Sequence, residues 1–197
     1  MYKNHFGFKH AILDKAVPTL WKNKQYDELL NQFNGLLSSP GVGLLTGHSG
    51  VGKTITLNHI IQHINPHQYK VMYNPETNLC QLEIYQNLAV SLGIEPSYRR
   101  SKLWRDIKET LLMLYDQASV LPLWIIDEAH YLPVDFFKDL PAFLNFKFDS
   151  KMPITIWLVG YPELSDILNR QSNEALRSRL HVRYSMKPLT HRDDFKQ

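Results

Sequence analysis

The residues with the clearest chemistry in this chain form the stretch GHSGVGKT, from Gly47 to Thr54. It matches the pattern G-x-x-x-x-G-K-[ST], whose glycines let successive backbone N–H groups point inward at phosphate oxygens. Lys53 is expected to reach the β- and γ-phosphates, and Thr54 to offer a hydroxyl to Mg²⁺. An apolar run precedes the stretch and a plausible helix follows it. The residues expected to bind ATP with Mg²⁺ here are Gly47, His48, Ser49, Gly50, Val51, Gly52, Lys53, Thr54 and Ile55.

A pair of acids, Asp127 and Glu128, follows the apolar run at 123–126. An apolar strand that ends in an acid is typical of phosphate-loop enzymes, which use the acid to hold Mg²⁺. Asp127 is therefore assigned to the metal together with Thr54, and Glu128 to polarising an attacking water. The letters DEAH at 127–130 also spell the motif of one helicase class. A helicase of that class needs two such domains and this chain has room for one, so we interpret the acids as Mg²⁺ and water ligands.

The elements that must position these residues follow from the hydrophobic pattern. The predicted strands are 43–46, 70–73, 121–126, 154–159 and 181–185. The predicted helices are 24–37, 55–64, 77–92, 101–118, 134–148 with an interruption at Pro141, 163–168 and 173–179. Strands that alternate with helices, and that are almost entirely apolar, indicate a mostly parallel sheet covered on both faces. The sequence predicts an α/β fold of three layers, αβα, with five strands.

The composition fits one ordinary globular domain. The chain has 197 residues, of which 44% are hydrophobic and 21% charged, and a formal net charge of +3. A mildly basic chain permits nucleic acid as a partner but does not demand it. The single cysteine, Cys80, excludes an internal disulfide framework and favours a reducing cytosol. No apolar run approaches the length of a membrane span, so we expect a cytoplasmic protein that does not insert into membranes.

Beyond these motifs, several longer stretches resemble one family. They are LWIIDEAH, ITIWLVGYPEL, NEALRSRLHVRYSMKPLT, the N-terminal HFGF, and the run 144–146 with Asp149 after it. Together they resemble the AAA+ ATPases of the ExeA/TniB type, which include secretion-accessory ATPases and the ATPases of bacterial transposons. The resemblance covers residues 4–190, and "GxPEL" and "LRSRL" are its specific parts. It implies a P-loop AAA+ fold.

The resemblance also implies roles for residues outside the phosphate loop. The strand at 154–159 would carry sensor 1 and lie between the other two core strands. The family often has Gln after Gly160, where this chain has Tyr161, and Asn145 is a candidate substitute. Arg177 and Arg179 match the segment that presents an arginine finger to a neighbouring subunit, which accelerates hydrolysis ~10³–10⁵-fold. Surface solubility is the alternative role for both arginines.

The division of the chain is likewise implied by the resemblance. Residues 1–41 would form an N-terminal extension and a helix, with Phe6 near the adenine. Residues 42–190 would form the ATPase domain, and 191–197 the start of a lid or a tail. The family continues into a helical lid with a sensor-2 arginine. Because only 191–197 are present here, we expect hydrolysis to be weak in this form.

A basic stretch lies between the second and third predicted strands. It is YRRSKLWR at 98–105, and the residues expected to contact DNA are Arg99, Arg100, Lys102 and Arg105. Contacts to phosphates would be weakly sequence-specific and sensitive to salt. The alternative is a solvated helix start. Cations at a helix N-terminus carry a small cost, which favours some other use for these residues.

Three functions stay open at this point. The first is an ATP-binding and ATP-hydrolysing regulator of DNA transposition. It would bind double-stranded DNA as a homo-oligomeric ring or filament and contact a transposase or other mobile-element proteins. The second is a secretion or cell-envelope accessory ATPase with a membrane-protein partner. The third is a nucleotide switch with little hydrolysis.

Overall fold

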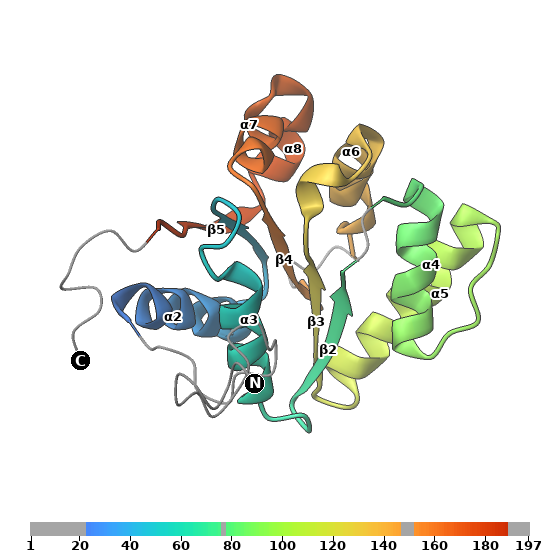
Figure 1. The fold of residues 1–197 in the computed structure, drawn as a ribbon. Coiled ribbons are helices and arrows are strands. Elements are labelled where there is room, and N and C mark those ends of the chain that lie inside the picture. The colour runs from blue at the N-terminus through green and yellow to red at the C-terminus, as the bar shows by residue number, and fades with distance from the viewer. Residues whose placement is uncertain (1–22, 76–77, 147–151, 189–197) are drawn as a thin grey trace, which may run out of the picture.

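The computed structural model describes residues 23–75, 78–146 and 152–188, which form one sheet with helices on both sides (Figure 1). The strands are β1 Val42–Thr46, β2 Tyr69–Asn74, β3 Leu121–Ile126, β4 Thr155–Gly160 and β5 Leu180–Ser185. Their order is β2-β3-β4-β1-β5, and all neighbouring strands are parallel. The predicted α/β class is confirmed, with a sheet that is wholly rather than mostly parallel. The strand expected between the other two core strands is β4, which lies between β3 and β1.

The helices cover the two faces of this sheet. They are α2 Lys24–Ser38, α3 Lys53–Gln62, α4 Gln81–Leu92, α5 Arg100–Asp116, α6 Val134–Phe143, α7 Glu163–Asn169 and α8 Glu174–Arg177. Two short 3-10 helices, η1 Ala129–Tyr131 and η2 Gln171–Asn173, complete the described elements. Helices α2 and α3 pack in one buried cluster, and α4 to α8 contribute to the other. The fold is thus the predicted three-layer αβα arrangement.

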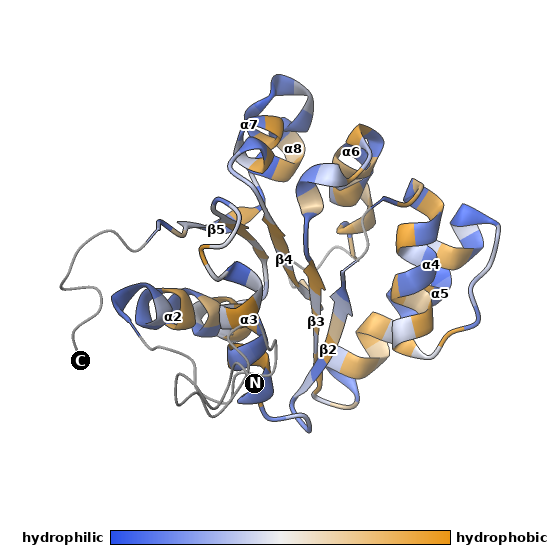
Figure 2. Cartoon of the chain, in the orientation of Figure 1, coloured by the Kyte–Doolittle hydropathy of each residue, from blue (hydrophilic) through white to orange (hydrophobic). Residues whose placement is uncertain are grey.

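Successive residues of the central strands alternate between the two clusters. Leu44 of β1 lies in the cluster that includes α4 to α8, and Leu45 in the cluster with α2 and α3. Trp124 and Leu123 of β3 divide in the same way. Because every residue of β1, β3 and β4 is buried, both faces of these strands are apolar, as Figure 2 shows for the middle of the sheet. This double burial holds the carboxyl ends of the strands in register.

Helix α2 belongs to this core through its apolar face. The Asn23 side chain accepts a hydrogen bond from the Tyr26 backbone N–H and caps the first turn. Phe33 stacks on Trp157 of β4 with ring centroids 5.5 Å apart. The helix also holds the end of β5, because Gln25 exchanges two hydrogen bonds with the backbone of Lys187. The division of the chain at 41/42 and at 190/191 stays a prediction.

Several predicted helix boundaries differ from the structure by one or two residues, and two are wrong by more. Helix α4 begins at Gln81 rather than at 77, because the Glu83 carboxylate accepts the Cys80 backbone N–H and closes the first turn there. Residue 77 itself lies outside the described residues. Helix α6 ends at Phe143 rather than at 148, and Pro141 lies within it without an interruption. Pro141 lacks the N–H that would bond to Phe137, but the helix continues for two more residues before it ends.

Within the described ranges, no helix combines the length and apolarity that a membrane crossing requires.

Candidate nucleotide site

The phosphate loop connects the end of β1 to the start of α3. Gly50 and Gly52 have positive φ angles of 78° and 95°, which favour glycine. At Gly47 a Cβ would lie 2.8 Å from the backbone oxygen of Met186, so a side chain is excluded there too. Met186, just after β5, donates its backbone N–H to Thr46 at 2.8 Å. The loop is therefore braced on one side by the end of β5, while His48, Ser49 and Gly50 at its tip are exposed.

Lys53 begins α3, and its side chain turns back beneath the loop. Its residue is only 6% exposed, and its Nζ donates to the carbonyl oxygens of Gly47 at 2.8 Å and His48 at 3.1 Å. Burial lowers the pKa of Lys53, and the nearby charges of Glu128 and Asp127 oppose this shift. A buried ammonium surrounded by loop backbone fits a phosphate group, which would supply the anionic partner.

Asp127, at the end of β3, meets the start of α3 directly. Its Oδ2 accepts hydrogen bonds from the hydroxyls of Thr54 and Tyr73, each at 2.8 Å, and its Oδ1 accepts the Glu128 backbone N–H at 2.9 Å. Asp127 is 3% exposed. A carboxylate and a hydroxyl in contact form the oxygen set that Mg²⁺ prefers, so Thr54 and Asp127 fit the predicted metal site.

Tyr73, near the end of β2, is a site residue that the motifs did not indicate. Its hydroxyl reaches Asp127 because β2 and β3 are neighbours in register, with Tyr73 opposite Ile125. Burial, together with the hydrogen bond to the Asp127 carboxylate, raises the pKa of Tyr73. The hydroxyl is therefore a firm donor. No spacing along the sequence relates β2 to β3, so only the strand order could have found this contact.

Glu128 and His130 lie in the turn between β3 and α6. Glu128 has a left-handed backbone with φ 53°, a conformation uncommon outside glycine. Its Oε2 lies 3.5 Å from Nδ1 of His130. The His130 ring stacks on Tyr161, the residue after β4, with centroids 4.3 Å apart. The Tyr161 ring also faces the ammonium of Lys53, 5.0 Å from its centroid. The sequence motifs did not reveal this group of contacts either.

The two candidate finger arginines lie at the end of α8, away from these contacts. Arg177 is exposed in the last turn of the helix. Arg179 donates to the backbone oxygen of Ala175 at 2.7 Å and to Oδ1 of Asn145 at 2.8 Å. The Asn145 side chain is thus engaged by Arg179 within the chain. Their predicted role toward a neighbouring subunit stays a prediction, as does that of Phe6, which lies outside the described residues.

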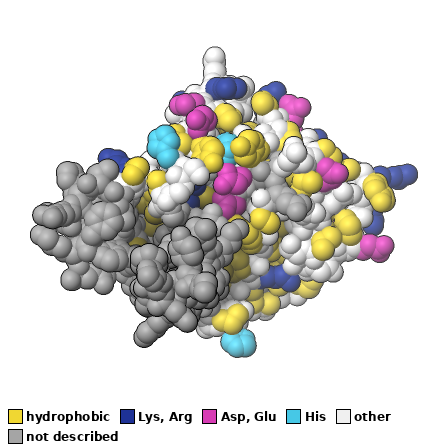
Figure 3. Space-filling view, in the orientation of Figure 1, with side chains coloured by type: hydrophobic (Ala, Val, Ile, Leu, Met, Phe, Trp, Pro, Cys, Tyr) yellow, Lys and Arg dark blue, Asp and Glu magenta, His cyan; other side chains and the backbone are white. Residues whose placement is uncertain are grey.

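The basic stretch at the start of α5 is largely paired with acids. Arg100 forms an ion pair with Asp139 of α6 and lies over the ring of Trp104, 4.3 Å from its centroid. Lys102 lies 3.6 Å from Asp106, and Arg105 lies 3.8 Å from the same carboxylate. Arg99 precedes the helix and is exposed. Among the described residues on the face shown in Figure 3, Lys and Arg side chains are scattered rather than gathered in one patch.

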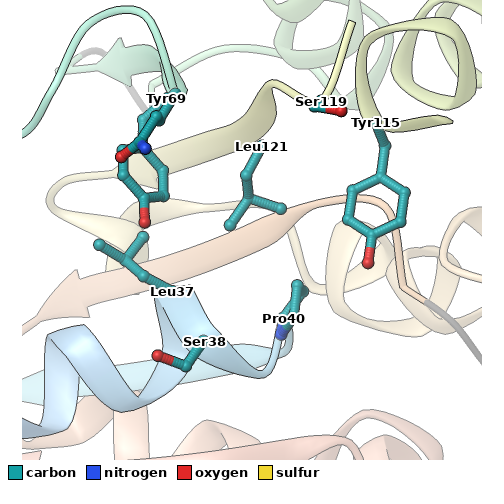
Figure 4. Close-up of a pocket in the computed structure, with 8 residues that line it drawn as sticks. Leu37, Ser38, Pro40, Tyr69, Tyr115, Ser119 and Leu121 are labelled. Carbon is teal, nitrogen blue, oxygen red and sulfur yellow. The ribbon is translucent and has the colours of Figure 1, made fainter. Parts of the chain in front are cut away.

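A separate cavity of about 260 Å³ lies at the opposite end of the sheet. In Figure 4 Tyr69 and Tyr115 flank it, with Leu121 between them and Leu37, Ser38 and Pro40 on the α2 side. Tyr69 and Leu121 are the first residues of β2 and β3, whereas the phosphate loop and Asp127 follow the carboxyl ends of β1 and β3. The cavity is therefore distinct from the nucleotide site.

Comparisons with known proteins agree with this geometry. General secretion pathway protein A of Aeromonas hydrophila is 27% identical over 199 residues, which cover 98% of this chain and 36% of that protein. Cdc6p of Pyrobaculum aerophilum is similar in structure, with a TM-score of 0.65, 18% identity, and coverage of 90% of this chain and 50% of that one. The ORC1 protein of Aeropyrum pernix, solved in complex with DNA, gives a TM-score of 0.65 at 15% identity, covering 86% and 47%.

These structural similarities show a shared fold, and the chain spans half or less of each of these proteins. The predicted resemblance to AAA+ ATPases is confirmed, whereas its transposon-type branch stays a prediction. The family described as "AAA domain" matches residues 36–168, which include the phosphate loop, Asp127 and Glu128. The chain therefore belongs to the AAA domain family.

Proposed function

We propose that this domain binds ATP with Mg²⁺ and hydrolyses it to ADP and phosphate. The observation that supports this most directly is the hydrogen bond between Thr54 and Asp127, at 2.8 Å, which joins the phosphate loop to the end of β3. It gathers the lysine, the hydroxyl and the acids of two motifs that are separated by more than seventy positions in the sequence. Such a convergence at the carboxyl edge of a parallel sheet is where ligands bind in α/β folds.

The residues divide the chemistry between them. Lys53 would neutralise charge on the β- and γ-phosphoryl oxygens, and Thr54 with Asp127 would hold Mg²⁺, which supplies further charge neutralisation. Glu128 would orient a water and accept its proton as the water oxygen attacks the γ-phosphorus. The bond from the γ-phosphorus to the bridging oxygen breaks, and ADP leaves with that electron pair. Positioning and electrostatics account for most of the acceleration in phosphoryl transfer.

Two substitutions test this assignment. Lys53→Ala should weaken ATP binding by roughly a hundredfold, because charge-assisted hydrogen bonds to phosphate oxygens are lost. Glu128→Gln should keep ATP binding and lower turnover by about 10²–10⁴-fold, because the proton acceptor is removed. Binding is measured by titration with a fluorescent ATP analogue, and turnover by phosphate release. Lys24→Ala and Glu109→Gln, which change exposed residues of α2 and α5, are matched controls.

Wild-type ATP affinity in Lys53→Ala would overturn the phosphate-loop assignment. Unchanged turnover in Glu128→Gln would remove Glu128 from the reaction.

For the wider role, we favour an accessory ATPase of the secretion type, acting as one part of a longer protein in the cytoplasm. The similarity to General secretion pathway protein A extends over 98% of this chain, which supports this choice. Copies of the domain would assemble with the nucleotide between subunits, Arg179 of one copy facing the phosphate held by Lys53 of the next. The pairing of Arg100, Lys102 and Arg105 with acids leaves fewer free cations for DNA than the sequence suggested.

Regulation of DNA transposition, with a transposase as partner, is the second candidate. One observation favours it: Tyr98 is 88% exposed beside the exposed Arg99. An exposed aromatic ring next to a cation is a common element of nucleic-acid contacts.

A further inference from the structure

The His130 ring contacts two tyrosine rings. Tyr131, the next residue, has its ring centroid 4.0 Å away at an interplanar angle of 40°. Tyr161, which follows β4, stacks on His130 at 4.3 Å with an angle of 24°. The His130 side chain is only 8% exposed. These contacts fix the plane of the imidazole and leave its edge to make specific contacts.

The Nδ1 edge of His130 connects two separate parts of the site. It lies 3.5 Å from Oε2 of Glu128 and 3.4 Å from the backbone nitrogen of Tyr161. In the tautomer that carries its proton on Nδ1, the ring donates to the Glu128 carboxylate. The approach depends on Gly160, where a Cβ would be 3.0 Å from Nδ1 of His130. A glycine at the end of β4 therefore lets the histidine close on the strand while it contacts the glutamate.

Lys53 approaches the same tyrosine ring. Its Nζ lies 5.0 Å from the Tyr161 centroid, within the range of cation–π attraction. Burial strengthens such an attraction, and Lys53 is 6% exposed. Lys53, Tyr161, His130 and Glu128 thus form a continuous row of contacts from the phosphate loop to the candidate general base.

We propose that Tyr161 and His130 are positioning residues that couple Lys53 to Glu128, and that Tyr161 acts through the face of its ring. This deepens the proposed ATPase function and rests on it. When Lys53 turns from the loop carbonyls toward a phosphate, its contact with the face of the Tyr161 ring tightens. The stacked His130 then shifts against Glu128, so that the glutamate is aligned when phosphate is bound. Where the family often has a Gln after Gly160, whose amide could contact the site by hydrogen bonds, the Tyr161 ring would contact it by stacking.

A matched pair of substitutions separates the ring face from simple packing. Tyr161→Leu removes the π face but keeps an apolar side chain, and should weaken ATP binding roughly three- to tenfold as the cation–π contact is lost. It should also lower turnover about tenfold or more, because misplaced catalytic groups are costly. Tyr161→Phe restores the π face without the hydroxyl and should recover most of both losses.

Binding is followed by titration with a fluorescent ATP analogue and Mg²⁺, and turnover by phosphate release. If Phe and Leu at 161 behave alike, the ring face has no role and the proposal is overturned. This includes the case in which both variants lose binding and turnover equally because only the hydroxyl matters.

His130→Ala tests the second half of the row. Turnover should fall roughly ten- to a hundredfold, because Glu128 loses its contact with His130, while ATP affinity changes less than about twofold. Gly160→Ala should act in the same direction by pushing His130 away from Glu128. His63→Ala, at an exposed histidine of the stacked pair His59–His63, is the control. Equal losses in kcat and in ATP affinity, or no loss at all, would contradict the coupling.

Wild type and Glu128→Gln are measured in parallel to separate two kinds of failure. A wild-type chain that neither binds nor hydrolyses ATP overturns the proposed function, and the coupling with it. A wild-type chain that hydrolyses ATP while His130→Ala matches it overturns the coupling alone.

Discussion

The carboxylate of Asp127 is held on both of its oxygens by the chain itself. Thr54 and Tyr73 donate to Oδ2, and the Glu128 backbone donates to Oδ1. Residues that orient a metal-binding carboxylate tune the metal site, and their loss typically costs about 10–100-fold in metal affinity or activity. Tyr73 is therefore as much part of the predicted Mg²⁺ site as the residues of the motifs.

We predict that Tyr73→Phe raises the Mg²⁺ concentration needed for half-maximal ATP binding by roughly tenfold, because loss of an outer-shell partner weakens metal affinity. Binding without Mg²⁺ should change little, since Lys53 and the loop are untouched. A Mg²⁺ titration in the presence of a fluorescent ATP analogue measures both. Tyr69→Phe, at the start of the same strand, is the control. An unchanged Mg²⁺ dependence would show that the hydroxyl does not tune the metal.

Among single residues, the sequence predicted those that stand in continuous motifs. It did not predict the contacts of residues that only the arrangement of the strands brings into the site. Lys53, Thr54 and Asp127 stand at fixed spacings whose chemistry is known, and the structure brings them together. Tyr73 and Tyr161 come from different strands, and their roles depend on which strands are neighbours. Hydrophobic patterning does not specify strand order, so neither contact could be read from it.

At the scale of elements, the strands were predicted closely because their burial is complete. Every residue of β1, β3 and β4 is buried, which gives the uninterrupted apolar runs seen in the sequence. Helix boundaries depend on single capping contacts, such as that of Glu83 with Cys80, and were missed. The helical turn η1 was also missed, because three residues are too few to show a period.

The start of α5 is the element on which the choice of partner depends. If it binds DNA, Arg99→Ala with Lys102→Ala should weaken binding and flatten its dependence on salt, because two phosphate contacts are lost. A mobility shift of double-stranded DNA, with and without ATP and Mg²⁺ at two salt concentrations, measures this. Lys24→Ala, remote from α5, is the control. No DNA binding by the wild type under any condition would leave the secretion-type role as the better candidate.

For the whole molecule, the predicted oligomer depends on Arg179 acting on a neighbouring copy. Within the chain this arginine is bonded to Ala175 and Asn145, and Asn145 in turn accepts from Lys108 through its backbone oxygen. An arginine finger would have to leave these partners and reach across a subunit boundary. The cost is modest, since Arg179 is only partly buried and its hydrogen bonds compete with water.

We expect Arg179→Ala alone to lower turnover by about 10³-fold, in the range known for arginine fingers. Mixing it with Glu128→Gln should restore a measurable part of the activity. In such a mixture the intact site of one copy meets the intact arginine of the other. Arg183→Ala is the control, because it removes a nearby arginine of β5 that is bonded to Asn169 within the same chain. A mixture no more active than its components would exclude action between copies.

One consequence concerns the way the chain leaves the sheet after β5. Met186 is bonded to Thr46, just before the first glycine of the phosphate loop, and the next residue, Lys187, is bonded to Gln25 of α2. The exit of the chain is thus clamped between the loop and a helix of the core. A displacement of Gly47 must move the backbone at Met186. Movement of the phosphate loop is therefore transmitted through Met186 and Lys187 to α2, so that the loop and this helix respond to phosphate as one unit.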